Sequence, residues 1–191
     1  MTLFERSRPM DGRRREIIRL GHPVLRERAL EVGRERFGTR FLRDLERDLL
    51  RTMFEDNGMG LAAPQIAVPA RVFAYYVPGA DDTDEVAPRV VVNPELELHG
   101  ERDALGWEGC LSLPGLRGIV PRHARLRLRG ATTDGAPLEI DAEGLHARVI
   151  QHEYDHLDGI VFLDRMTDLH HLMFEEEWER YGDRRDLPVE R

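Results

Sequence analysis

Two histidines and a glutamate in the C-terminal third form the pattern with the clearest chemical meaning. His152 and His156 lie four residues apart, so on a helix they project from one face and can bind one metal ion. Glu153 follows the first histidine directly, which suits a base that reaches water at the ion without binding the ion itself. Because this pattern also arises by chance, it indicates a metal site without establishing one.

A catalytic site of the zinc type needs a third protein ligand and an open fourth position. Cys110, the only cysteine, lies in the constrained segment EGCLSLP of residues 108–114. A lone cysteine is more often an inert buried side chain than a ligand. The histidine pair favours the ligand role for this cysteine, and we predict that Cys110, His152 and His156 hold one ion.

A glycine-flanked loop, GMGLAAPQ, covers residues 58–65. Its glycines permit a ligand to approach the backbone closely, and Gln65 offers an amide donor. On local grounds alone, the segment also fits the end of a helix that leads into a tight turn.

Composition excludes several classes of protein. The formal charge of −8 opposes binding to the phosphate backbone of nucleic acid. No lysine is present to form a Schiff base or to complete a phosphate-binding P-loop. One cysteine cannot form an intramolecular disulfide, and no apolar run is long enough to span a membrane. We therefore expect an untargeted, cytoplasmic protein without membrane or nucleic-acid partners.

Hydrophobic periodicity predicts the elements that position these residues. Apolar residues at spacings of three and four predict a helix that Thr39 caps and that ends at Asn57 and Gly58. A second helix begins at Glu143, carries the histidines and closes at Gly159, and a third is expected over residues 168–181. β-prone or alternating runs predict strands at residues 72–77, 90–92, 96–98 and 125–129. The order of these elements predicts an α+β fold with small antiparallel or mixed sheets packed around a central metal-binding helix.

The length of 191 residues fits one domain. We expect a polar N-terminal extension over residues 1–15 that need not be ordered. A single catalytic domain is expected over residues 16–181, followed by a tail over residues 182–191.

Taken together, GMGLAAPQ, EGCLSLP and QHEYDHLDG resemble the peptide deformylases, in the order that this family has them. Connecting stretches such as IIRLGHPVLRERA, VVNPE, GLRGIVPR and VFLDRM are also family-like, so the resemblance covers most of the chain. It implies removal of the formyl group from the N-terminal formyl-methionine of new proteins. It also implies an iron(II) ion in the cell, with zinc or nickel able to replace it.

The resemblance further implies roles for individual residues. The ion activates water for attack on the formyl carbonyl, and Glu153 takes the proton and returns it to the departing amine. Gln65 and the backbone N–H of Leu111 stabilise the oxyanion. The implied substrate-binding residues are Met59, Leu145 and Val149 around the methionine side chain, and Met59, Gly60 and Gly109 along the peptide backbone. Glu108 and Arg122 are expected to form a supporting ion pair, and Asp155 is a candidate partner for a ligand histidine.

Other readings remain open at this point. A metallopeptidase would use the same H-E-x-x-H chemistry, with a third ligand such as His170 or His171. A structural metal site would need a fourth ligand, for which Glu153 or His146 are candidates. Some deformylases dock on ribosomes through a basic C-terminal helix, whereas the acidic run of residues 175–179 opposes that contact here.

Overall fold

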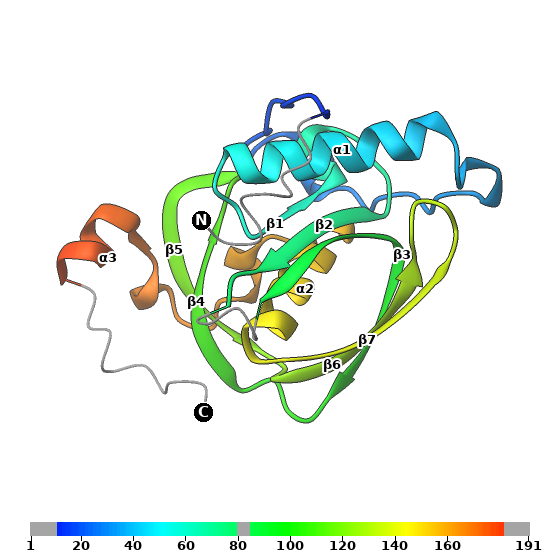
Figure 1. Cartoon of the computed structure of the whole chain (residues 1–191). Helices are drawn as coiled ribbons and strands as arrows, with labels where there is room; N and C mark the ends of the chain where they lie inside the picture. The colour runs from blue at the N-terminus through cyan, green and yellow to red at the C-terminus, as the bar shows by residue number, and fades with distance from the viewer. Residues whose placement is uncertain (1–10, 80–84, 182–191) are drawn as a thin grey trace.

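The structure, a computed structural model, describes residues 11–79 and 85–181. Its helices are α1 (Arg40–Glu55), α2 (Gly144–Leu157) and α3 (Glu175–Tyr181). Its strands are β1 (Gly60–Ala62), β2 (Val72–Val77), β3 (Val86–His99), β4 (Ala104–Cys110), β5 (Leu113–Arg122), β6 (Arg125–Ala131), β7 (Pro137–Glu143) and β8 (Met173–Phe174). They form a five-stranded sheet in the order β1-β2-β3-β6-β7 and a three-stranded sheet in the order β4-β5-β8 (Figure 1). The predicted α+β class, with small antiparallel sheets around one central helix, is confirmed.

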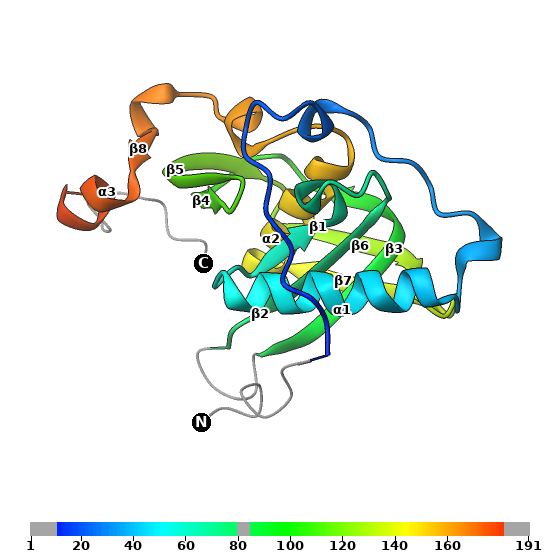
Figure 2. The ribbon, with the colours of Figure 1, turned by 90° about the horizontal axis from the view of Figure 1, so that it is seen from above.

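The five-stranded sheet is covered by α1 on one face and by α2 on the other (Figures 1 and 2). Successive side chains of a strand point to opposite faces, and β2 follows this rule. Val72 and Ala74 pack in the core cluster of α1, whereas Phe73 and Tyr75 pack in the cluster of α2. Because β2 is buried on both faces, it reads in sequence as an uninterrupted apolar run.

Helix α1 agrees closely with its prediction. Its apolar stripe buries Leu42, Leu45, Leu49 and Met53 against the sheet. The chain leaves the helix through Asn57, whose φ is 56°, and the Gly58 N–H donates to the Met53 carbonyl at 2.8 Å. Thr39 occupies the N-cap position, but its hydroxyl donates to the Arg36 carbonyl, so the helix begins without a side-chain cap.

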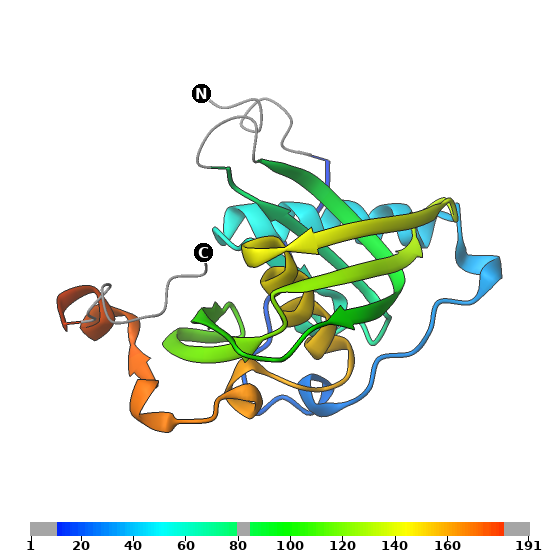
Figure 3. The same cartoon turned by 90° about the horizontal axis from the view of Figure 1, so that it is seen from below.

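Helix α2 lies between the five-stranded sheet and the hairpin of β4 and β5, as Figure 3 shows. It begins after Glu143 and is followed by Gly159 with a φ of 74°, as predicted. A Cβ on Gly159 would also lie 2.7 Å from the Arg26 carbonyl carbon, so two constraints require glycine there.

Two element predictions are wrong in part. Residues 90–92 and 96–98 belong to one strand, β3, whose register shifts between Val92 and Glu95. The predicted helix over residues 168–181 exists only from Glu175, because a short 3-10 turn and β8 precede it. Asp168 does accept a bond from the His170 N–H, but the turn that it caps ends at His171.

Near the N-terminus, residues 11–15 cross α1 and contact it (Figure 2). The Arg13 N–H donates to Asp48 Oδ1 at 2.8 Å, and the Arg15 N–H donates to Thr52 Oγ1 at 2.9 Å. Residues 1–10 of the predicted extension and the predicted tail over residues 182–191 lie outside the described residues. Within the described ranges, no helix has the length and apolar character needed to cross a bilayer.

Candidate metal centre

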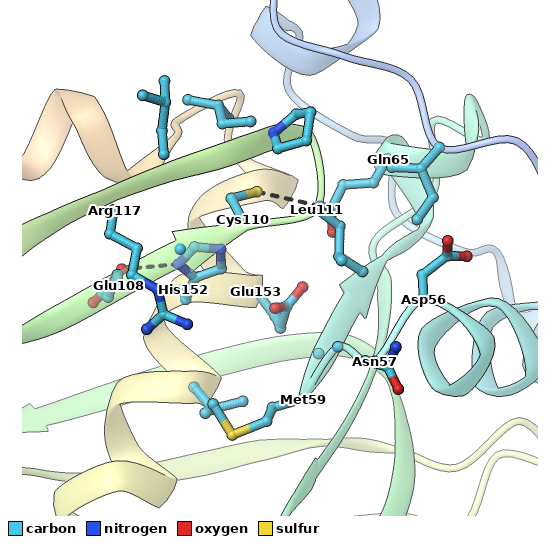
Figure 4. Close-up of a pocket in the computed structure, with 18 of the residues that line it drawn as sticks. Asp56, Asn57, Met59, Gln65, Glu108, Cys110, Leu111, Arg117, His152 and Glu153 are labelled. Carbon is cyan, nitrogen blue, oxygen red and sulfur yellow. Dashed lines mark hydrogen bonds and ion pairs between the residues drawn. The ribbon is translucent and has the colours of Figure 1, made fainter. Parts of the chain in front are cut away.

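Three predicted ligands come together where α2 faces the end of β4. The sulfur of Cys110 and the ring nitrogens of His152 and His156 lie within 4.8 Å of one another. Cys110 Sγ is 3.2 Å from His156 Nε2. Figure 4 shows Cys110 and His152 on one wall of a pocket, with Glu153 facing them.

The orientation of His152 is fixed by Glu108. His152 Nδ1 lies 2.8 Å from Glu108 Oε2, which leaves Nε2 to face the other two ligands. The sequence predicts Glu108 only as the ion-pair partner of Arg122. Its position two residues before Cys110 on a strand, and therefore on the same face, is the signal that would have indicated this second role.

Two arginines hold Glu108 in place. Arg122 donates to both oxygens of Glu108, at 2.9 and 3.0 Å, and confirms the predicted pair. Arg148 adds a bond of 3.0 Å from α2. Burial alone would raise the pKa of Glu108, but Arg122 and the bond from His152 hold it well below its ordinary range. Glu108 is therefore a permanent carboxylate at the back of the site.

Asp155 is buried on α2, but it does not act as the partner of a ligand histidine. It accepts hydrogen bonds from Arg122 and Arg165 instead, the latter at 2.6 Å. These bonds extend the ion-pair network behind Glu108 to the segment that follows α2. A helix carboxylate is usually solvated, whereas Asp155 is buried with its charge paired to two arginines.

Glu153 lies beside the ligands with its side chain enclosed. The residue is 4% exposed, and its Oε2 atom has no hydrogen-bond partner within the described part of the chain. A Cβ on Gly60 would lie 2.2 Å from Glu153 Oε1, so glycine at that position makes room for the carboxylate. Burial raises the pKa of Glu153 to about 7, although the nearby His152 and Arg122 lower it. A carboxyl group with such a pKa can take and return a proton near neutral pH.

This raised pKa predicts how the stability of the metal-free protein depends on pH. The folded pKa of about 7 exceeds the ordinary value of 4.5, so the folded state holds the proton more tightly than the unfolded state. The resulting stabilisation is fully present below pH 4.5 and is lost as the pH rises to about 7. At 1.36 kcal/mol per pH unit, the loss amounts to roughly 3 kcal/mol.

Urea unfolding of the metal-free protein between pH 4 and 8, beside a Glu153→Gln variant, measures this contribution. Other titrating groups are common to both proteins and cancel in the difference. We expect the free energy of unfolding of the wild type to fall relative to the variant over this range. A constant difference would show that the carboxyl group titrates with its ordinary pKa.

Gln65 is buried next to the sulfur of Cys110 with a fixed amide orientation. Its Oε1 accepts the Ala62 N–H at 2.8 Å, which turns Nε2 toward Ser112 Oγ at 3.2 Å and Cys110 Sγ at 3.5 Å. Leu111 follows Cys110 in the turn between β4 and β5, and it lines the pocket beside Gln65 (Figure 4). A donor side chain and the turn that follows Cys110 thus flank one side of the ligand group.

One groove, of about 1080 Å³, is lined by every predicted catalytic, substrate-binding and metal-ligating residue except His156, which is buried. Met59 and Leu145 are partly open to solvent, at 38% and 42% exposure, whereas Val149 is buried. β1 and β4 border the groove, and each is the edge strand of its sheet. The sequence does not indicate that Arg117, Trp107 and Glu175 also line it.

The ligand group suits a divalent ion with an open coordination position. Burial, together with the neighbouring His152 and Arg122, keeps the pKa of His156 well below its ordinary value, so the imidazole is neutral as ligation requires. Among the described residues, the group contains three ligands. His146 is not a fourth, because its Nε2 lies 3.2 Å from the Tyr75 hydroxyl, and His170 and His171 are exposed.

Comparison with known proteins agrees with this site. Residues 14–171 match the sequence model of the polypeptide deformylase family. Peptide deformylase 1 of Nitrosomonas europaea is 44% identical over 156 residues, which are 80% of this chain and 88% of that protein. Peptide deformylase 1 of Xanthomonas axonopodis pv. citri is 42% identical over 165 residues, which are 85% and 95% of the two chains.

Solved structures show the same fold. The Met-Ala-Ser-bound class I type b peptide deformylase of Acinetobacter baumannii is 35% identical, with a TM-score of 0.74 over 81% of this chain and 99% of that one. The peptide deformylase of Thermotoga maritima is 34% identical, with a TM-score of 0.72 over 82% and 99% of the two chains. On its sequence, its fold and its ligand group, the chain belongs to the polypeptide deformylase family.

Proposed function

We propose that the chain hydrolyses the formyl group from the N-terminal formyl-methionine of new proteins. The observation that carries this proposal is the enclosed carboxyl group of Glu153 beside Cys110, His152 and His156, in a groove between two edge strands. An extended peptide fits between two such strands because their free edges offer backbone hydrogen bonds. A peptide N-terminus in that groove brings its formyl carbon to the ligand group.

A divalent ion held by Cys110, His152 and His156 would supply Lewis acidity to water and to the formyl carbonyl. Glu153 takes a proton from the attacking water, whose oxygen forms the new bond to the formyl carbon. The bond between that carbon and the methionine nitrogen then breaks. Glu153 delivers the proton to the departing amine, so the products are formate and a free N-terminus.

Charge that develops on the carbonyl oxygen needs donors that are already oriented. We assign this role to Gln65 Nε2 and to the Leu111 N–H. The bond from the Ala62 N–H to Gln65 Oε1 supports the assignment, because it keeps the NH₂ end of the amide toward the site. Because these donors are already oriented in the folded protein, no free energy is spent on orienting them during the reaction.

The methionine side chain enters the part of the groove that Met59, Leu145 and Val149 line. The backbones of Met59, Gly60 and Gly109 pair with the peptide. Leu145 and Val149 support this arrangement, since they stand about two turns and one turn before Glu153 on α2. The Acinetobacter baumannii relative has Met-Ala-Ser bound, which supports a peptide with an N-terminal methionine as the occupant of this groove.

For the ion we propose iron(II) in the cell, with zinc or nickel as substitutes, because the thiolate of Cys110 suits these softer metals. We place the activity in the cytoplasm, where ribosomes release formyl-methionyl chains. The acidic run of Glu175, Glu176, Glu177 and Glu179 on α3 argues against docking on ribosomal RNA through this helix.

The test is formate release from formyl-Met-Ala-Ser by nickel-loaded protein, with a chelator-treated sample as the control. We expect rapid release that the chelator abolishes and added metal restores, while far-UV circular dichroism is unchanged. Mass spectrometry of the products separates loss of the formyl group from cleavage between residues. Internal cleavage, or no release by folded and metal-replete protein, would overturn the proposal.

A further inference from the structure

Helix α3 contributes Glu175 to the lining of the substrate groove, although it lies beyond residues 14–171, which match the family. It is held against β4 and β5 by aromatic contacts. The Trp178 ring lies 5.9 Å from the Trp107 ring of β4, and the Arg117 guanidinium of β5 lies 4.6 Å above the Trp178 ring. Figures 1 and 3 show α3 beside the three-stranded sheet, away from α2.

An ion pair joins the first residue of α3 to β5. Arg117 donates to Glu175 Oε1 through Nε at 2.8 Å and through Nη2 at 2.6 Å. Both bonds end on Oε1, and within the described part of the chain no hydrogen bond ends on Oε2, which can therefore accept one from a second cation. Glu175, Arg117 and Trp107 all line the groove, and Figure 4 shows Arg117 among the side chains of this pocket.

The side chains of β4 alternate between its two faces, and this alternation determines which residue of a bound peptide lies near the Arg117–Glu175 ion pair. Glu108 and Cys110 point toward α2, where they contact His152 and His156. Trp107 and Gly109 therefore belong to the opposite face of the strand. Arg117 lies directly across from Gly109 in the β4–β5 ladder, which places it on that opposite face too.

The direction of the peptide rests on the proposed function. The formyl group lies near Gln65 and Leu111, and the methionine side chain lies on the α2 face near Leu145 and Val149. The chain thus leaves the metal site toward Trp107, antiparallel to β4. Because side chains of an extended peptide alternate, the side chain of the second residue points to the opposite face, beside Arg117 and Glu175.

We infer that Glu175 of α3 forms a subsite for the second residue of the substrate, and that this subsite favours a cationic over an anionic side chain. Glu175 Oε2 can accept a bond from a lysine or arginine of the peptide. An acidic side chain would instead meet the charge of α3, which carries four glutamates and one arginine. Arg117 gives two of its donors to Glu175 and its planar face to Trp178, so it has fewer donors left for such a side chain.

Formate release from formyl-Met-Lys-Ser, formyl-Met-Ala-Ser and formyl-Met-Glu-Ser tests this inference. The side chains of Glu175 and Arg117 are partly exposed, so we expect kcat/KM to favour lysine over glutamate by about fivefold. This ratio should shrink as salt is added, because salt screens exposed charges. Equal kcat/KM values for the two charged peptides at low salt would overturn the inference.

Two variants distinguish a specific subsite at Glu175 from an effect of the net charge of α3. Glu175→Gln leaves Arg117 unpaired, so the preference should disappear or turn toward the glutamate peptide. Glu176→Gln removes the same charge from an exposed position on α3 that does not line the groove, and it should keep most of the preference. Equal effects of the two variants would show that only the net charge of α3 matters, which would also overturn the inference.

Release of formate from formyl-Met-Ala-Ser reports on the proposed function alone. If that release fails, calorimetric titration with the product peptides Met-Lys-Ser and Met-Glu-Ser still decides the subsite. Tighter binding of the lysine peptide that Glu175→Gln abolishes would support the inference without any catalysis. Equal affinities for the two peptides would reject it.

Discussion

A Glu153→Gln variant is expected to lose about 10²- to 10⁴-fold in kcat, the range that general acid–base catalysis contributes. Glutamine keeps the shape of the side chain in its enclosed space beside Gly60 but can neither take nor return a proton. Its neutral side chain also matches the protonated form that burial favours, so the fold should be retained. Formate release at saturating formyl-Met-Ala-Ser, with nickel-loaded protein, measures the effect.

Metal content is the necessary control for that variant. Glu153 is outside the ligand group, so Glu153→Gln should bind one ion per chain, as the wild type does. His156→Ala, which removes a ligand, should lose both metal and activity. If Glu153→Gln retained more than about a tenth of the wild-type kcat, the role of general base would belong to another group.

The second large effect is expected on stability, from Glu108→Ala. Breaking a buried ion pair by removing one partner costs about 3–5 kcal/mol, because a buried charge loses its compensation. Arg122 keeps its bond to Asp155, and Arg148 keeps bonds to the carbonyls of Ala104 and Val120. We therefore expect a loss near the lower end, about 3 kcal/mol in the free energy of unfolding by urea.

The same variant should weaken metal binding, because His152 loses the carboxylate that orients its ring. Removing such a partner typically costs 10- to 100-fold in metal affinity, which competition with a chromophoric chelator measures. Glu139→Ala is the matched control, since its pair with Arg129 is exposed and its loss should cost under about 1 kcal/mol. Similar losses of stability in the two variants would contradict the buried role of Glu108.

How far the sequence predicts this site depends on whether the residues lie in one element or several. His152, Glu153 and His156 are predictable because the helical period alone brings them to one region. Cys110 comes from β4, and only the chemical need for a third ligand links it to the helix. The roles of Asp155 and Arg148 depend on ion pairs between distant segments, which no local pattern contains.

The same distinction applies to the fold, because elements with a local apolar pattern are predictable and elements that depend on pairing with another segment are not. The residues of α1 have regular apolar spacing and those of β2 form an unbroken apolar run, so the bounds of both elements are predicted to within two or three residues. β5 is not predicted, because two prolines and two glycines interrupt the pattern of its residues, LPGLRGIVPR. Its structure is determined by pairing with β4 instead. In β3, the irregularity at Asn93, whose φ is 49°, divides one long strand into two apolar runs.

Both tryptophans of the chain meet in one aromatic contact between β4 and α3. The intrinsic fluorescence of the protein is therefore a local signal, which reports whether α3 lies against the sheet and not whether the whole core is folded. In a denaturant titration, detachment of this short helix would change the emission before the ellipticity of the sheets and of α2 changes. Emission and far-UV circular dichroism would then give different midpoints, and only the second would describe the domain that holds the ligand group.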